Sequence, residues 1–218
     1  MPRRLIPVKL ITGADLASAD TEKADFTVIM TAAVNSDSDF FFLEKFKKRG
    51  ADVTEAMNEL LRQMTKYNST GYIEYNRFEF IMKTARTLVR AGFYGDPVTV
   101  NRVLNRIVTI GHYTDKVSRI IDTLQQPNRA GKLYIPSHWN DVRDQFLFYP
   151  AVEHDDLLDC IHIIVANATA PTHTTAGIQD YHQGTGRLIS GRIAAPMTLN
   201  GQLAARKYNV WTGTYKRN

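Results

Sequence analysis

The sequence predicts an α/β domain with a mixed β-sheet flanked by helices, and three observations carry that prediction. The first third of the chain contains three apolar, β-rich runs joined by short connections, which indicates an antiparallel three-strand meander. After about residue 52, helical apolar spacing alternates with short strand-like runs, which is typical of strands that join a sheet in parallel. From about residue 171 the periodicity fades. We therefore expect one domain over residues 1–170 and a basic segment over 171–218, either packed on that domain or a tail.

The three predicted strands follow one another closely. The first is "RLIPVKLITGADLA", which is apolar up to Gly13 and turns polar at Asp15. The second covers residues 26–34, and the third covers residues 39–49. Between the second and the third, the "NSDSD" run has the composition of a hairpin turn.

Beyond the meander, the expected elements alternate between helix and strand. Apolar residues at helical spacing begin at Val53, and Asp52 or Thr54 can cap that helix. Residues 93–113 fit a strand or a helix equally well. The other expected elements are a strand at 70–76, a helix at 78–89 closed by Gly92, a helix that begins near Asp115 and that Pro127 ends, a strand at 131–136, a short helix at 139–148 and a final helix at about 155–168.

The composition narrows the class of protein. The single cysteine, Cys160, excludes an internal disulfide framework and every multi-cysteine zinc pattern. No stretch approaches the roughly 20 apolar residues of a membrane helix, so no membrane partner is expected. The formal net charge is +5, and residues 168–218 hold all of it, with six basic side chains against the single acid Asp180. Such a segment either contacts phosphates electrostatically or is simply solvated.

Acidic residues stand at the ends of predicted elements. Asp15 follows the first strand, Glu74 lies in the strand at 70–76, and Asp155 and Asp156 open the last helix, with Asp159 one turn further on. Carboxylates that converge raise one another's pKa unless a cation is present, and hard ions such as Mg²⁺ and Mn²⁺ prefer such oxygens. Each acid also has a structural reading: a turn acid, an exposed strand residue, or a helix N-cap.

Four motifs follow one another in an order that matches a known protein family. They are "ITGADLASADTEKADFTVIM", "GYIEYNRFEF", "DKVSRIIDTL" with "GKLYI", and "FYPAVEHDDLLDCIHII". Over residues 8–168 they resemble the nuclease domain of bacteriophage terminase large subunits. There an Asp ends the first strand, an acid lies in the central strand, and a His-Asp-Asp…Asp-Ala signature closes the domain, with Cys160 standing here where Ala is usual.

The resemblance implies an RNase H-like fold and a metal-dependent endonuclease that cuts double-stranded, concatemeric viral DNA during genome packaging. Carried over by motif, Asp15, Glu74 and Asp155 or Asp156 would hold two Mg²⁺ or Mn²⁺ ions, with Asp159 as a further carboxylate. The expected partners are DNA, a portal protein and a small terminase subunit, in the host-cell cytoplasm. No G-x-x-x-x-G-K-[ST] loop occurs, so ATP hydrolysis is not expected. We favour an excised domain over a separately encoded piece.

The basic residues and His154 each have a binding role and a structural role to consider. Lys116 and Arg119 lie three apart on one expected helix, where they contact DNA phosphate or pair with Asp115 or Asp122. The basic run at 44–50 is interpreted as a solvated strand edge. His154 either orients a ligand, shuttles a proton or is a hydrogen-bonded loop residue.

Two other functions fit the same sequence. One is another RNase H-like phosphodiester enzyme of the junction-resolvase or integrase type. The other is a non-catalytic module that clamps DNA or docks on a portal.

Overall fold

The computed structural model describes residues 5–17, 26–91, 96–111 and 115–170, together with four short strands beyond residue 178. Gly92, which was expected to close a helix, lies outside these residues.

A mixed sheet forms the centre of the molecule, with strand order β5-β4-β1-β2-β3-β6. Strands β1, β2 and β3 are antiparallel neighbours, whereas β4 pairs with β1, β5 with β4 and β6 with β3 in parallel. The predicted meander followed by parallel strands is therefore confirmed. The bounds are β1 Leu5–Asp15, β2 Phe26–Asn35, β3 Phe40–Arg49, β4 Thr70–Glu74, β5 Ile107–Ile110 and β6 Leu133–Tyr134.

Short strands beyond the sixth extend this arrangement. β7 (Gln179–His182) pairs antiparallel with the first residues of β1, and β8 (Arg187–Ile189) pairs with β7. β9 (Lys207–Asn209) and β10 (Thr214–Lys216) pair with each other in a two-stranded sheet. Part of the basic C-terminal segment thus joins the main sheet.

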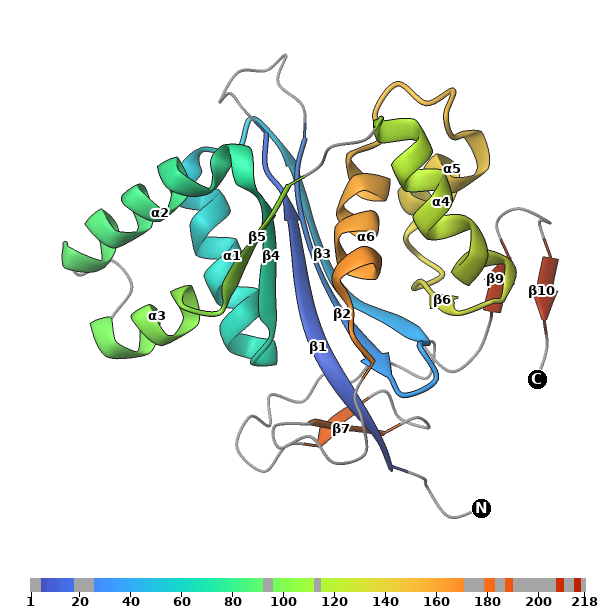
Figure 1. Cartoon of the computed structure of the whole chain (residues 1–218), viewed down its shortest axis with the longest axis horizontal. Coiled ribbons are helices and arrows are strands. Elements are labelled where there is room, and N and C mark those ends of the chain that lie inside the picture. Colours follow the sequence, from blue (N-terminus) through green and yellow to red (C-terminus); the bar gives the residue numbers. More distant parts are fainter. Residues whose placement is uncertain are drawn as a thin grey trace.

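Helices cover both faces of the sheet and give three layers (Figure 1). One face carries α1 (Val53–Tyr67), α2 (Tyr75–Arg90) and α3 (Pro97–Leu104). The opposite face carries α4 (Lys116–Arg129), α5 (Asn140–Phe148) and α6 (Asp156–Asn167). Among the described residues no helix is long and apolar enough to cross a membrane.

Local side-chain bonds explain several boundaries. The Asn35 side-chain oxygen accepts hydrogen bonds from the backbone N–H groups of Asp37 and Asp39, which fixes the predicted turn between β2 and β3. Asp52 accepts from the N–H of Glu55 and is the cap of α1, which decides between the two candidates.

Three expectations about elements need correction or completion. The strand predicted at 70–76 ends at Glu74, because the backbone becomes helical immediately afterwards. Pro127 does not end α4, which continues to Arg129; Pro127 lies in the last turn, where its ring costs a single N–H. The ambiguous stretch 93–113 contains both α3 and β5.

Alternation along the strands gives each face its own core. Ile11, Val28 and Met30 pack with α6, whereas Ile29 packs with α1 on the other side. Gly13 lies against α6, where an added Cβ would be 2.7 Å from the Ile164 side chain. A glycine at this position therefore lets α6 approach β1 closely, and that approach positions the site described next.

Candidate functional site

Strand register brings two of the predicted acids together. β1 and β4 run in parallel with Gly13 beside Tyr72, so Asp15 and Glu74, two residues further on, stand at the same edge of the sheet. Gly13 and Tyr72 both pack on the α6 side, and side chains two residues apart on a strand share a face. Asp15 and Glu74 therefore face α6.

The first turn of α6 supplies the other acids. The middle of α6 lies on β1, because the Cys160 thiol donates a hydrogen bond of 3.3 Å to the Gly13 carbonyl. The N-terminal residues Asp156 and Asp159 then lie beside the end of β1, and both are buried. Residues about 140 positions apart in the sequence thus meet at one edge of the sheet.

Asp15, Glu74, Asp155, Asp156 and Asp159 form a carboxylate cluster, and Asp15 lies within it. Burial first, and then the negative charges of Asp159, Glu74 and Asp156, raise the pKa of Asp15 well above its ordinary value. Lys116 opposes this rise without reversing it.

Two cations of α4 reach into the carboxylate cluster. Lys116 Nζ lies 2.7 Å from an oxygen of Asp155 and 2.8 Å from one of Asp159. Arg119 Nη2 lies 2.9 Å from Asp159 and 3.9 Å from Glu74. Burial alone would lower the pKa of Lys116, but the hydrogen bonds to Asp155 and Asp159 raise it.

These ion pairs differ from the pairing considered from the sequence. Lys116 and Arg119 are bound to carboxylates of α6 and β4, not to Asp115 or Asp122 of their own helix. Asp115 instead caps α4, since it accepts from the N–H of Ser118. Contact of either cation with DNA stays a prediction.

The structural reading of Asp155 as a side-chain N-cap is wrong. Asp155 occupies the N-cap position of α6, yet its side chain makes no capping hydrogen bond. Its carboxylate binds Lys116 instead, because that ammonium lies within reach across the helix interface.

His154 lies beside the carboxylate cluster but bonds elsewhere. Its Nε2 is 2.8 Å from Arg49 Nη2, and its ring meets the Phe26 ring edge-on. The sequence analysis interpreted Arg49 only as part of a solvated strand edge and did not predict its contact with His154. Strand alternation at Phe26 and Arg49 would have been the signal that both side chains lie on the His154 side of the sheet.

The carboxylate cluster has the right kind of ligand atoms for a divalent ion, but its side chains are not arranged around an ion site. Five carboxylates offer hard oxygen ligands, which are those that Mg²⁺ and Mn²⁺ prefer. In the part of the chain that the structure describes, however, no three His, Cys, Asp or Glu side chains are arranged to hold an ion. Lys116 and Arg119 lie on oxygens of Asp155, Asp159 and Glu74, so those oxygens can bind an ion only if the two cations move away.

Comparison with known proteins adds no relative. No family model matches the chain, and no curated protein matches it in sequence. What the carboxylate cluster does must therefore be argued from its chemistry.

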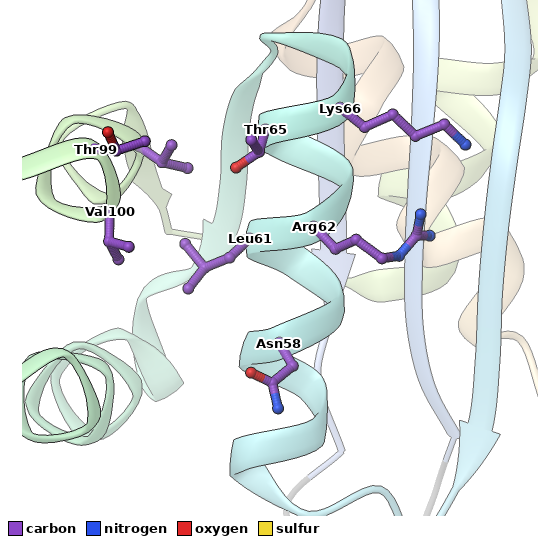
Figure 2. Close-up of a pocket in the computed structure, with 8 residues that line it drawn as sticks. Asn58, Leu61, Arg62, Thr65, Lys66, Thr99 and Val100 are labelled. Atoms are coloured by element: carbon purple, nitrogen blue, oxygen red, sulfur yellow. The ribbon is translucent and has the colours of Figure 1, made fainter. Parts of the chain in front are cut away.

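A groove on the opposite side of the sheet contrasts with the cluster. It lies between α1 and α3 and has a volume of about 430 Å³. Figure 2 shows Leu61 and Thr65 turned toward Val100, while Arg62 and Lys66 extend away from α3. Both cations bind Glu44, so the groove offers an apolar wall and no uncompensated charge.

Proposed function

We propose that this chain is a metal-dependent endonuclease that cleaves double-stranded DNA, with the RNase H-like fold and packaging role of terminase nuclease domains. One observation carries the proposal. Asp15, Glu74 and the acids of α6 come from three distant elements and converge at strand ends, where the pKa of Asp15 is raised. In α/β sheets ligands gather near the ends of strands and the starts of helices, and perturbed carboxylates mark functional sites.

Each residue has a task in this proposal. Asp15 and Glu74, fixed on neighbouring strands, hold one side of the site. Asp155 or Asp156 holds the other side, with Asp159 as a further carboxylate. Bound divalent ions would supply activation of water and neutralisation of the departing 3′-oxygen. Lys116 and Arg119 keep the carboxylates together until then and are free to bind phosphate afterwards.

The deciding experiment uses supercoiled plasmid incubated with the full chain and Mn²⁺, Mg²⁺ or EDTA. We expect nicked and linear DNA with Mn²⁺ or Mg²⁺ and none with EDTA. Asp15→Asn keeps the shape of the side chain and removes its charge, so cleavage should fall by at least about 100-fold. Asp144→Asn, on the exposed surface of α5, is the matched control and should cut normally. Full activity of Asp15→Asn would refute the proposal.

A second candidate is favoured by the ion pairs of Lys116 and Arg119. These pairs already bind Asp155, Asp159 and Glu74, so the carboxylate cluster could be a structural network in a non-catalytic DNA-clamping module. That module would bind duplex DNA with a steep salt dependence, and it would not cut the DNA whichever metal is added. The plasmid experiment separates the two functions directly.

A further inference from the structure

A bulge in β3 changes which side chains face the carboxylate cluster. Thr31 pairs with Glu44 and Ala32 with Phe42, which leaves Leu43 as an extra residue in β3. Because side chains alternate along a strand, one inserted residue exchanges the two faces for every later position. Phe42 packs in the core beneath α6, whereas Glu44 binds Arg62 of α1.

The residues after the bulge confirm this exchange. Lys45 binds Asp141 of α5 at 2.5 Å, so it faces the same side as α6. Lys48 binds Glu55 of α1 at 2.7 Å, so it faces the other side. Lys47 and Arg49 alternate with Lys48 and therefore project toward the carboxylate cluster.

Register places Lys47 in line with the cluster. Asp15 pairs with Val28, and Val28 pairs with Lys47. Neighbouring strands are about 4.8 Å apart, so two steps separate the strands of Lys47 and Asp15 by about 10 Å. Each strand of a duplex has one phosphate per 3.4 Å of helix axis, so measured along that axis the spacing corresponds to roughly three nucleotides.

Lys47 and Arg49 differ from the other cations of β3 in their partners. Neither makes an ion pair with a carboxylate among the described residues, while Lys45 and Lys48 both do. Instead both cations lie over the Phe26 ring, with Lys47 Nζ 4.2 Å and Arg49 Cζ 4.6 Å from its centroid.

The environment makes these two cations receptive to an anion. The Phe26 ring contacts both cations, and Arg49 donates a hydrogen bond to His154, which orients the guanidinium. Burial lowers the pKa of Lys47, because lost hydration outweighs the attraction of Asp141 and Asp156. A phosphate would restore the missing counter-charge, and a guanidinium binds phosphate oxygens in pairs.

We propose that Lys47 and Arg49, held on Phe26, bind a backbone phosphate of the DNA strand that enters the carboxylate cluster. This inference rests on the proposed nuclease function and adds to it the residues that position the strand. Lys47 and Arg49 are positioning residues, which contact a phosphate a few nucleotides from the one that is cut.

Duplex binding in EDTA tests the inference without cleavage. Fluorescence anisotropy of a labelled 30-base-pair duplex would be followed over a range of salt concentrations for the full chain and for Lys47→Gln/Arg49→Gln. We expect affinity to fall about 10-fold or more. The slope of log K against log salt should shrink by about 0.9, which is the contribution of one phosphate contact.

Lys48→Gln is the matched control, because it removes the same charge from the same strand on the opposite face. It should change affinity less than about twofold and leave the slope unchanged. The single variant Arg49→Gln, at an exposed side chain, replaces the double variant if the latter does not fold.

The outcomes separate this inference from the function on which it rests. A double variant that binds with the affinity and salt slope of the parent overturns the phosphate site, even if the parent cuts plasmid. Loss of binding in the double variant supports the site, even if no metal produces cleavage. A parent chain that binds no duplex overturns both.

Discussion

The two faces of the central sheet handle charge in opposite ways. On the α1 face, Glu44 and Glu59 are matched by Arg62 and Lys66, with nitrogen–oxygen distances of 2.5–2.8 Å. On the α6 face, Lys116 and Arg119 pair with three of the five carboxylates of the cluster, namely Asp155, Asp159 and Glu74. Glu44 and Glu59 are thus matched by cations, whereas the carboxylate cluster holds more acids than cations bound to it.

The polar groups buried beneath α1 are likewise matched, because they hydrogen-bond to one another. Thr12 bonds Thr31 at 2.8 Å and Ser69 at 2.6 Å, and Thr31 donates to Gln63. The pKa values follow the same division. Burial would raise the pKa of Glu44, yet hydrogen bonds from Lys66 and Arg62 lower it, whereas the pKa of Asp15 is raised.

This difference shows which face of the sheet lowers the stability of the fold. Satisfied ion pairs on the α1 face hold the helices to the sheet, but uncompensated carboxylates on the α6 face oppose folding at neutral pH. A sequence that retains such a cost has a use for it, and cation binding is the use that carboxylates serve best.

The largest expected effect on stability concerns the two glycines that face the helices. An added Cβ at Gly13 would meet the Cys160 carbonyl at 3.1 Å and Ile164 at 2.7 Å, which are parts of a packed helix. Gly13→Ala should therefore lower the free energy of unfolding by about 2–3 kcal/mol. Urea denaturation measures this change.

Gly71→Ala is the matched variant on the α1 face. Its Cβ would meet the end of the Met64 side chain at 2.7 Å, which can swing away. We expect a change below about 1 kcal/mol. Equal losses at the two glycines would show that α6 is seated no more tightly than α1.

Removing one acid from each face should change stability in opposite directions. Asp15→Asn should raise the free energy of unfolding at pH 7 in EDTA, because it removes a charge that burial and its acidic neighbours disfavour. Glu44→Gln should lower it by about 1 kcal/mol, since Lys66 and Arg62 lose their shared partner. Thermal unfolding of both variants measures the two signs, and a loss in both would remove the contrast.

The pH dependence of stability should show the same contrast. The folded pKa of Asp15 lies above its unfolded value of about 4, so the folded state binds the proton more tightly. Its contribution to stability is complete below about pH 4 and is lost as pH rises through the folded pKa. The contribution of Glu44 is present above its unfolded pKa and is lost as pH falls.

Urea midpoints between pH 4 and pH 8 in EDTA measure this dependence. Asp15→Asn should lack the decline with rising pH that the parent shows. Superimposable profiles would mean that Asp15 titrates normally in the folded chain.

The smallest expected effect concerns competition between Lys116 and a bound ion. Lys116→Gln frees oxygens of Asp155 and Asp159, so the Mn²⁺ concentration that gives half of the maximal rise in Tm should fall a few-fold. Lys48→Gln, whose partner Glu55 lies on α1, should leave that concentration unchanged. A Tm rise of the same size in Asp15→Asn would place the ion away from the carboxylate cluster.

The sequence predicted the fold well where a pattern depends on neighbours along the chain. Apolar spacing located α1, the meander and the last helix, because periodicity is a local property. The prediction that Pro127 ends α4 was wrong, and residues 93–113 were left open between strand and helix. Packing in the folded chain decides such cases. The convergence of Asp15 and Glu74 was expected from the family resemblance, and the parallel pairing of β1 with β4 brings the two acids to one edge of the sheet.

Partner choice and side-chain direction were less accessible. Lys116 pairs with α6 because α4 packs beside that helix, which no local spacing reveals. The direction of Lys47 depends on one unpaired residue in β3, and its neighbours alone indicate a plain solvated edge. Register is needed to see it, and register is a property of the folded sheet.

The pairing of β7 with the first residues of β1 limits how this chain can be shortened. A version that stops near residue 170 would leave the backbone groups of Leu5–Val8 without the partners that β7 provides. An exposed, unpaired strand edge of this kind pairs with strands from other molecules and promotes aggregation. Shortened proteins made for crystallography should therefore retain residues through β8.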